Sequence, residues 1–289
     1  MKTLFVTPSD TRWASTRIRA AWPARYVNGA TIAPHGEHQN IEADNYIFVK
    51  LFDEEFSKQA KQRGKRIFWD VCDPAWWWNP IEARMAADLA DGIVTSNAEL
   101  AHDFADWYGD ATKVRIIDDR IEPEHYPIQR KHTHAEPVRF VWYGAAQNRI
   151  SLFGALANLE RLEANGHNIA LTIFDDRPQN GWNFTDKFPI SYTQWSLEHE
   201  NQVIAAHDIA LLPPYPGPWG RVKSNNKSLT AWACGLPVSD GQDYEYLEEL
   251  CANEVLRQQM TAQGRLKLEV FYLAQISGME WEALLGKTA

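Results

Sequence analysis

Short runs of apolar residues alternate along this chain with stretches in which apolar residues recur at helical spacing. The runs have the length of buried strands, and the stretches between them are long enough for one helix each. A helix between successive strands lets the strands run in the same direction, so the alternation predicts parallel sheets covered on both faces. We expect strands at 3–7, 46–49, 66–71, 93–96, 114–117, 138–143, 170–174 and 208–213. We expect helices at 53–63, 80–89, from 97 onward, at 151–164 and within 244–285.

The alternation is interrupted once, by residues 122–137, which hold three prolines, three histidines and several charges. A chain of 289 residues is long enough for two domains. We therefore interpret this segment as a linker, and we expect its His132 and His134 to be solvated. The expected divisions are an N-terminal domain at 1–125, a linker at 126–137, a second domain at 138–270 and a C-terminal helix at 271–289.

The composition is that of an ordinary globular protein, with 45% hydrophobic and 23% charged residues. A formal net charge of −9 gives no broad basic face for non-specific nucleic-acid binding. The three cysteines lack CxxC spacing, which favours a reducing compartment over a disulfide framework or a structural zinc site. No apolar run has the roughly 18 residues of a membrane span. We expect a cytoplasmic protein.

The segment 220–238, GRVKSNNKSLTAWACGLPV, gathers the cations Arg221, Lys223 and Lys227 just before an apolar pattern at helical spacing that ends at Gly235. Good N-cap residues precede the pattern: Ser224, Asn225 and Asn226. The start of a helix attracts anions, and a lysine beside it adds a positive charge. The residues leave two interpretations open, a phosphate site and a capped helix with solvated lysines.

Six segments together resemble GT-B glycosyltransferases, especially the retaining nucleotide-sugar enzymes of glycosyltransferase group 1 (family 4-like). KSLTAWACGLPV is similar to the family pattern K-L-L-E-A-M-A-x-G-x-P-V-V, and DIALLP is similar to the strand before it. GKRIFWDVCDP, ADGIVTSNAEL and VRFVWYGAAQN resemble three further strand-and-loop segments of the family, and ASTRIRAAWPA resembles a segment that lines the cleft. The resemblance covers most of the chain, and the motifs occur in the family's order.

The resemblance implies two Rossmann-like domains that face a central cleft, with C-terminal helices that pack back toward the N-terminal domain. It implies a glycosyltransferase whose N-terminal domain takes the acceptor and whose C-terminal domain takes a nucleotide diphosphate sugar. It further implies transfer to an acceptor hydroxyl with retention, without a metal or another cofactor. The acceptor candidates are a glycan, a lipid-linked sugar, a small molecule or a hydroxylated DNA base of the phage type, which would be flipped out of the duplex. The net charge weighs against the DNA base.

By the same resemblance, Asp73, Lys227 and Arg149 are the expected catalytic residues. The residues expected to bind the donor are Ser224, Asn225, Asn226, Lys227, Thr230, Lys223 and Arg149. Those expected to line the acceptor side of the cleft are Arg17, Arg19, Trp76 and Trp77. Each has a structural alternative. Asp73 can cap the turn before Pro74, the arginines can form surface contacts, and the tryptophans of the run 76–78 can serve packing.

Two departures from the family pattern favour a different function. Thr230 stands where these enzymes usually have a glutamate that binds the ribose, and Val222 stands where an earlier glutamate would align. Pro8 to Arg19 also lacks the glycines common in the loop of the acceptor domain. The alternative is therefore a non-catalytic protein that binds a nucleotide or a sugar on the same fold.

Overall fold

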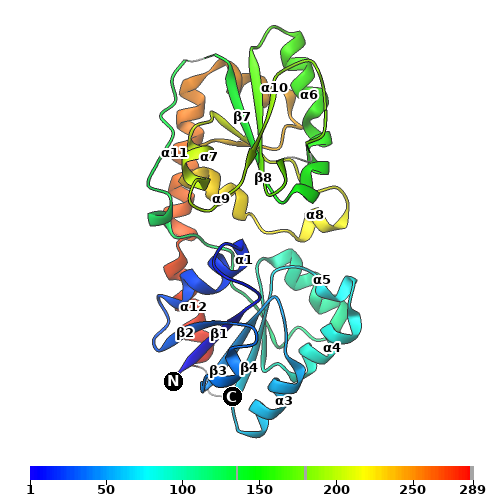
Figure 1. The fold of residues 1–289 in the computed structure, drawn as a ribbon, viewed down its shortest axis with the longest axis vertical. Coiled ribbons are helices and arrows are strands. Elements are labelled where there is room, and N and C mark those ends of the chain that lie inside the picture. The colour runs from blue at the N-terminus through cyan, green and yellow to red at the C-terminus, as the bar shows by residue number, and fades with distance from the viewer. Residues whose placement is uncertain (135, 179–180, 287–289) are drawn as a thin grey trace. The chain divides into compact units, whose positions relative to one another are not determined.

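The computed structural model describes residues 1–134, 136–178 and 181–286, and its chain forms two compact units (Figure 1). Unit 1 comprises Met1–Ile121, Arg221–Ser224 and Tyr272–Ala289, of which 287–289 lie outside the described residues. Unit 2 comprises Glu122–Gly220 and Asn225–Phe271. The division differs from the expected one because 126–137 is part of unit 2, and because 221–224 leaves the second domain and packs within unit 1.

Unit 1 alternates strands and helices along most of its length. Its elements are β1 (Thr3–Thr7), α1 (Ala14–Thr16), the π-helical η1 (Arg17–Ala21), α2 (Trp22–Ala24), β2 (Ala30–Pro34), η2 (His38–Asn40), β3 (Asn45–Val49), α3 (Glu54–Gln62), β4 (Arg66–Val71), η3 (Ala75–Trp77), α4 (Pro80–Leu89), β5 (Gly92–Thr95), α5 (Ala98–Tyr108), β6 (Val114–Ile116) and α12 (Ala274–Leu285). The strands lie in the order β2-β1-β3-β4-β5-β6, and every neighbouring pair is parallel.

The sheet of unit 1 is buried on both faces, as its continuous apolar strands predict. In β1, Leu4 and Val6 pack into one apolar cluster, whereas Phe5 between them packs into another on the opposite face. α12 covers the second face, where the Trp281 ring meets Phe5 edge-on with centroids 5.7 Å apart. The last helix thus belongs to the core of unit 1 (Figure 1).

Unit 2 repeats this architecture. Its elements are η4 (Pro123–His125), β7 (Val138–Gly144), η5 (Ala146–Leu152), α6 (Phe153–Ala164), β8 (Ile169–Asp175), β9 (Ile190–Gln194), α7 (Glu200–Ala205), β10 (Ile209–Leu211), α8 (Pro218–Val222, whose last residues count with unit 1), α9 (Asn226–Ala233), β11 (Val238–Ser239), α10 (Tyr244–Ala252) and α11 (Glu254–Phe271). The strands lie in the order β11-β10-β7-β8-β9, again all parallel.

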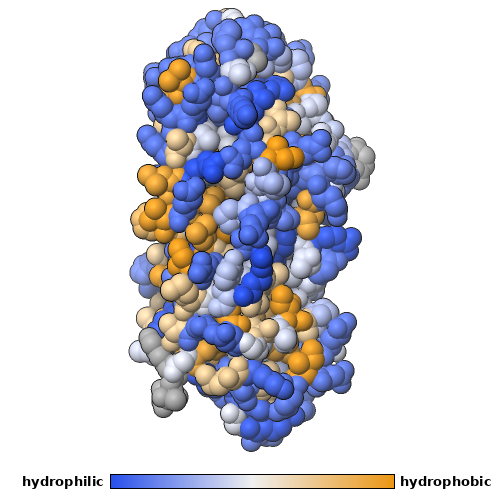
Figure 2. All heavy atoms as spheres, turned by 90° about the vertical axis from the view of Figure 1, so that its left-hand side faces the viewer, coloured by the Kyte–Doolittle hydropathy of each residue, from blue (hydrophilic) through white to orange (hydrophobic). Residues whose placement is uncertain are grey.

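The face of the molecule shown in Figure 2 is largely polar, with hydrophobic side chains at several places and most densely at the left edge about midway up the view. Exposed apolar residues near the end of α11 are Leu266, Val270 and Phe271. Within the described ranges, no helix combines the length and hydrophobicity that a membrane crossing requires. Cys72, Cys234 and Cys251 are free thiols.

Candidate functional site

The order of strands in unit 2 marks the place where a ligand is expected. The chain builds outward from β7 through β8 and β9, then returns to the other side of β7 with β10. In open parallel sheets, ligands bind beyond the carboxyl ends of the strands, at the point where the order reverses. In unit 2 this point lies between Gly144, at the end of β7, and Leu211, at the end of β10.

Lys227 reaches this point from the first turn of α9. A Cβ atom added to Gly144 would lie 2.6 Å from the Lys227 ammonium nitrogen, so the lysine passes directly over the glycine. The same nitrogen lies 4.9 Å from the centroid of the Trp142 ring, and the Tyr143 hydroxyl donates a hydrogen bond of 2.5 Å to the Lys227 carbonyl. Three successive residues of β7 therefore position Lys227.

The beginning of α9 adds to the positive potential of the lysine. Asn225 occupies the N-cap position, is exposed, and makes no side-chain capping bond among the described residues. Asn226 and Lys227 follow it and are half-buried. The helix dipole and the ammonium group thus coincide at the switch point, the arrangement that favours an anion such as a phosphate.

Replacing Gly144 by alanine is expected to weaken the binding of a phosphate-bearing ligand at least tenfold, because the new methyl group displaces the Lys227 ammonium and a hydrogen bond to a charged group contributes about 1.5–3 kcal/mol. The backbone at Gly144 (φ 153°) adds a stability cost that is unrelated to binding. Gly166→Ala is the matched control, since Gly166 also has a positive φ (88°) and no described atom near its added Cβ. Calorimetric titration with pyrophosphate measures the effect, and equal affinities in the two variants contradict it.

Arg149 has a different environment from the one expected. It lies in η5, is 1% exposed, and both Nε and Nη2 contact the Asp175 carboxylate, the latter at 2.7 Å. Nη2 also donates to the Arg177 carbonyl at 2.6 Å, and the guanidinium lies 5.1 Å from the Tyr192 ring centroid. Arg149 is therefore not a surface arginine, and these contacts do not direct its guanidinium to the switch point. They connect the loop after β7 to the end of β8.

Thr230 faces the interior of unit 2 and is 7% exposed. Its hydroxyl lies 3.4 Å from that of Tyr126, which donates to the Glu200 carboxylate at 3.2 Å. Trp195 donates to the other oxygen of Glu200 at 3.0 Å. The buried Glu200 carboxylate is therefore linked to Thr230 through the Tyr126 hydroxyl. The sequence reasoning did not single out Glu200, because nothing in its own segment marks it.

Lys223 and Ser224 each contact an aspartate. Both belong to unit 1, where the Lys223 ammonium lies 2.5 Å from the Asp73 carboxylate and the Ser224 hydroxyl donates to Asp119 at 2.5 Å. Val222, just before them, is 5% exposed and packs in an apolar cluster of unit 1. The expected donor segment is thus divided, and only its part from Asn225 onward belongs to unit 2.

Asp73 follows β4 at the carboxyl edge of the sheet of unit 1 and is held between two lysines. Lys50 lies 2.7 Å from one of its oxygens, opposite Lys223. Burial by itself would raise the pKa of Asp73, but the two ammonium groups hold that pKa below its ordinary value. The side chain is therefore a weak base at neutral pH and is better suited to accepting hydrogen bonds than to abstracting a proton.

Arg17 and Arg19 are buried at 5% and 2% exposure and therefore do not fit the expected acceptor surface. Arg19 bridges Asp70, at 2.9 and 3.1 Å, and Asp119, at 3.1 Å. Arg17 donates to the carbonyls of residues 11 and 12, at 3.1 and 2.6 Å. Both guanidinium groups stabilise the interior of unit 1, where the sequence reasoning considered only surface carboxylates as alternative partners.

The tryptophan run is divided between core and surface, as three consecutive aromatic side chains require. Trp76 is 3% exposed, stacks on Trp107 at 5.7 Å and donates to Asp103 at 2.7 Å, so its expected role at an acceptor surface does not fit. Trp77 is 39% exposed, donates to the same carboxylate at 2.9 Å, and retains an accessible ring. Trp78 is 53% exposed.

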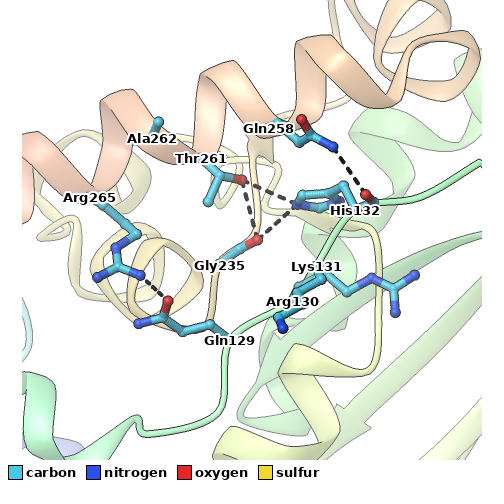
Figure 3. Close-up of a pocket in the computed structure, with 9 residues that line it drawn as sticks. All are labelled: Gln129, Arg130, Lys131, His132, Gly235, Gln258, Thr261, Ala262 and Arg265. Atoms are coloured by element: carbon cyan, nitrogen blue, oxygen red, sulfur yellow. Dashed lines mark hydrogen bonds between the residues drawn. The ribbon is translucent and has the colours of Figure 1, made fainter.

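A separate pocket of about 320 Å³ lies at the opposite edge of the sheet of unit 2, where the chain enters β7 and β11 (Figure 3). His132 lines it and is 6% exposed, so the expectation of a solvated histidine is wrong. Its Nε2 lies 2.9 Å from the Gly235 carbonyl and therefore donates to it. Burial lowers the pKa of His132. The segment 129–132 packs against α11 and Gly235, and it is not an exposed linker.

These features define the class of the protein by its fold: two Rossmann-like α/β units with all-parallel sheets, the GT-B fold of glycosyltransferases. Among solved structures, the chain is similar to HepE of Anabaena in complex with UDP (TM-score 0.69, 11% identity, 99% of this chain and 100% of that chain). It is similar to an alpha-glucosyltransferase in complex with UDP and a DNA containing an HMU base (TM-score 0.71, 10% identity, 99% of each chain).

A third similar structure is the lipopolysaccharide outer core galactosyltransferase WaaB, with a TM-score of 0.65, 12% identity and coverage of 99% of this chain and 100% of that chain. No protein-family model matches the sequence, and no curated protein matches it. At these identities the similarity establishes the fold, and the site residues of unit 2 carry the functional argument.

Proposed function

We propose that this protein transfers a sugar from a nucleotide diphosphate sugar to an acceptor hydroxyl, and that unit 2 binds the donor. The observation that carries this proposal is the Lys227 ammonium over Gly144, at the point where the strand order of unit 2 reverses. HepE and the alpha-glucosyltransferase were each solved with UDP, which makes UDP the first nucleotide to test.

Lys227 and the start of α9 would act on the leaving group. During transfer, the bond between the sugar carbon and the diphosphate oxygen breaks, and the oxygen of the acceptor hydroxyl forms a new bond to that carbon. The proton of the acceptor hydroxyl passes to the departing diphosphate oxygen. Negative charge develops on the diphosphate, and a preorganised cation beside a helix N-terminus stabilises this charge. Transfer of this kind needs no metal at the diphosphate, and we propose that none takes part.

Unit 1 would bind the acceptor at the carboxyl edge of its sheet. Asp73 lies at this edge and is held ionised between Lys50 and Lys223, so it can accept a hydrogen bond from a sugar or acceptor hydroxyl. The exposed ring of Trp77 offers a flat apolar surface nearby in sequence. We propose retention at the transferred carbon, as the family resemblance implies, with a glycan or a hydroxylated DNA base as acceptor.

UDP or a UDP-sugar is expected to stabilise the protein against thermal unfolding. A ligand at about 100 times its dissociation constant contributes about 2.7 kcal/mol to the free energy of unfolding. Differential scanning fluorimetry with UDP, GDP, ADP, TDP and their sugars measures this effect and ranks the bases. Absence of stabilisation by every diphosphate nucleotide contradicts the proposed donor site.

A second candidate function, nucleotide or sugar binding without catalysis, is favoured by the residue at position 230. The enzymes that the sequence resembles have a glutamate here, which binds the ribose. Thr230 stands in its place, and its hydroxyl points to Tyr126 in the interior. The two candidates differ in turnover. A transferase slowly hydrolyses a UDP-sugar even without an acceptor and releases UDP. A binding protein is stabilised by the nucleotide but releases no UDP from a UDP-sugar.

A further inference from the structure

The loops after two strands of unit 1 bring together three potential metal ligands. His35 directly follows the edge strand β2, His38 begins η2 in the same loop, and Asp53 lies after β3 at the start of α3. One ring nitrogen of each histidine and a carboxylate oxygen of Asp53 lie within 4.8 Å of one another. No other group of this kind occurs among the residues that the structure describes.

The distances between the ligand atoms are close to those of a metal site. Nε2 of His38 lies 3.2 Å from Oδ2 of Asp53, and Nε2 of His35 lies 3.7 Å from the same oxygen. A tetrahedral zinc ion with bonds of about 2.0–2.1 Å needs its ligand atoms about 3.3–3.4 Å apart. The rings of His35 and His38 are stacked with their centroids 5.2 Å apart, so coordination of one ion by all three atoms requires the exposed His35 ring to turn toward His38 and Asp53.

The side chains of Asp53 and His38 are held by their surroundings, and His35 is held by its backbone. Oδ1 of Asp53 accepts the Phe56 amide at 3.0 Å as the N-cap of α3, which directs Oδ2 toward the histidines. His38 is fully buried, with ring centroids 4.7 Å from Phe56 and 5.6 Å from Phe48. The backbone amide of His35 continues the pairing of β2 with β1 by donating to the Thr7 carbonyl at 2.8 Å.

The buried nitrogen of His38 points to a ligand. Its Nε2 is shielded from solvent and, within the described part of the chain, has no hydrogen bond of good geometry, although it faces the Asp53 carboxylate. A buried polar atom left in this state is costly. A metal ion between Nε2 and Oδ2 would satisfy the nitrogen and the carboxylate together.

Metal binding also requires a local rearrangement around His38. The Gly36 amide donates to Nδ1 of His38 at 3.2 Å, so the ring proton of the metal-free protein is on Nε2. Coordination through Nε2 moves the ring proton to Nδ1, and the Gly36 amide must turn to another acceptor. Gly36 is exposed, has a φ of 97°, and has no described atom within 4 Å of its added Cβ, so its peptide can turn toward water.

We propose that His35, His38 and Asp53 bind one divalent first-row transition-metal ion, zinc above all, through the two Nε2 atoms and Oδ2 of Asp53. Two imidazoles and one carboxylate form a ligand set that suits zinc and leaves a coordination position open. The His35 side chain is 47% exposed, so the open position faces solvent at the carboxyl edge of the sheet. This site is in unit 1, distinct from the diphosphate site proposed for unit 2, and does not depend on it.

The test uses the full-length, untagged protein, freed of metal with a chelator and dialysed. Titration with Zn²⁺ by calorimetry and with Co²⁺ by visible absorption is expected to show one tight equivalent per chain. His35→Ala is expected to weaken metal binding at least tenfold. Loss of a residue that only hydrogen-bonds to a metal ligand weakens binding roughly 10–100-fold, and loss of a ligand itself should cost no less. Asp53→Asn is expected to weaken metal binding by a similar factor. It should leave the N-cap of α3 intact, because asparagine is also a good N-cap residue.

The matched control is His102→Ala. His102 is likewise an exposed histidine beside a carboxylate, 3.4 Å from Asp106 on α5, but it has no third ligand. This variant is expected to bind Zn²⁺ and Co²⁺ like the wild type. The proposal is overturned if the wild type shows no saturable equivalent, or if His35→Ala and Asp53→Asn both bind as tightly as His102→Ala.

Discussion

Replacement of Lys227 by alanine is expected to lower nucleotide-sugar turnover by about 100- to 1,000-fold, the effect of removing one preorganised group that stabilises developing negative charge. The ammonium lies over Gly144 and 4.9 Å from the centroid of the Trp142 ring, and the Tyr143 hydroxyl holds the Lys227 backbone carbonyl. Release of UDP from a UDP-sugar, followed with and without acceptor, measures the effect. Binding of free UDP should weaken as well, because in the proposed site the same ammonium would contact the product.

Lys267→Ala is the control for this variant. Lys267 is on α11, and its ammonium also lies over an indole ring, 5.9 Å from the centroid of Trp232, but not at the switch point. Its loss should leave turnover and UDP binding unchanged. If the Lys227 and Lys267 variants retained the same turnover as the wild type, Lys227 would not be the group that stabilises the diphosphate.

Replacement of Arg19 by alanine is expected to destabilise unit 1 by about 3–5 kcal/mol, the cost of leaving a buried charge without its partner. Arg19 is 2% exposed and Asp70 is fully buried, so water cannot replace the lost guanidinium without opening the core. Burial raises the pKa of Asp70 to about 6, so the carboxyl is still ionised at pH 7 beside Arg19. Asp119 loses the same partner.

Urea denaturation followed by tryptophan fluorescence measures this loss, with the transitions of the two units fitted separately because a two-unit chain need not unfold in one step. Arg12→Ala is the control, since its pair with Asp10 is exposed on both sides and exposed pairs contribute little to stability. A loss below about 1 kcal/mol in the Arg19 variant would contradict a stabilising role for the buried network.

The central strands of both sheets could be predicted because each is a continuous apolar run that is buried on both faces. β2 and β9 were not predicted, for a physical reason. Both are edge strands, and of the ten residues in them only Ala33 is fully buried. Their sequences therefore lack the apolar run that identifies a central strand. β11 was missed because it is only two residues long.

The site was predictable where the signal is local. The position of Lys227 at the switch point could be predicted, because a cation and the start of a helix follow a strand closely in the sequence. Its role in binding stays a prediction. The acidic partners of Arg149, Lys223 and Arg19 could not be predicted, because they lie 26 to 150 residues away in the sequence. A single sequence does not show which distant carboxylate neutralises a given cation. His35 and His38 were passed over for the same reason, since Asp53 joins them only through the fold.

The most direct test of the proposed function is the release of UDP from UDP-glucose, and from other UDP-sugars, by the purified protein without acceptor, compared with Lys227→Ala and Lys267→Ala. The proposed transferase predicts slow, enzyme-dependent release that the Lys267 variant retains and the Lys227 variant loses. Stabilisation by UDP with no release from any nucleotide sugar, including when glycan and hydroxymethylated DNA acceptors are added, would contradict it.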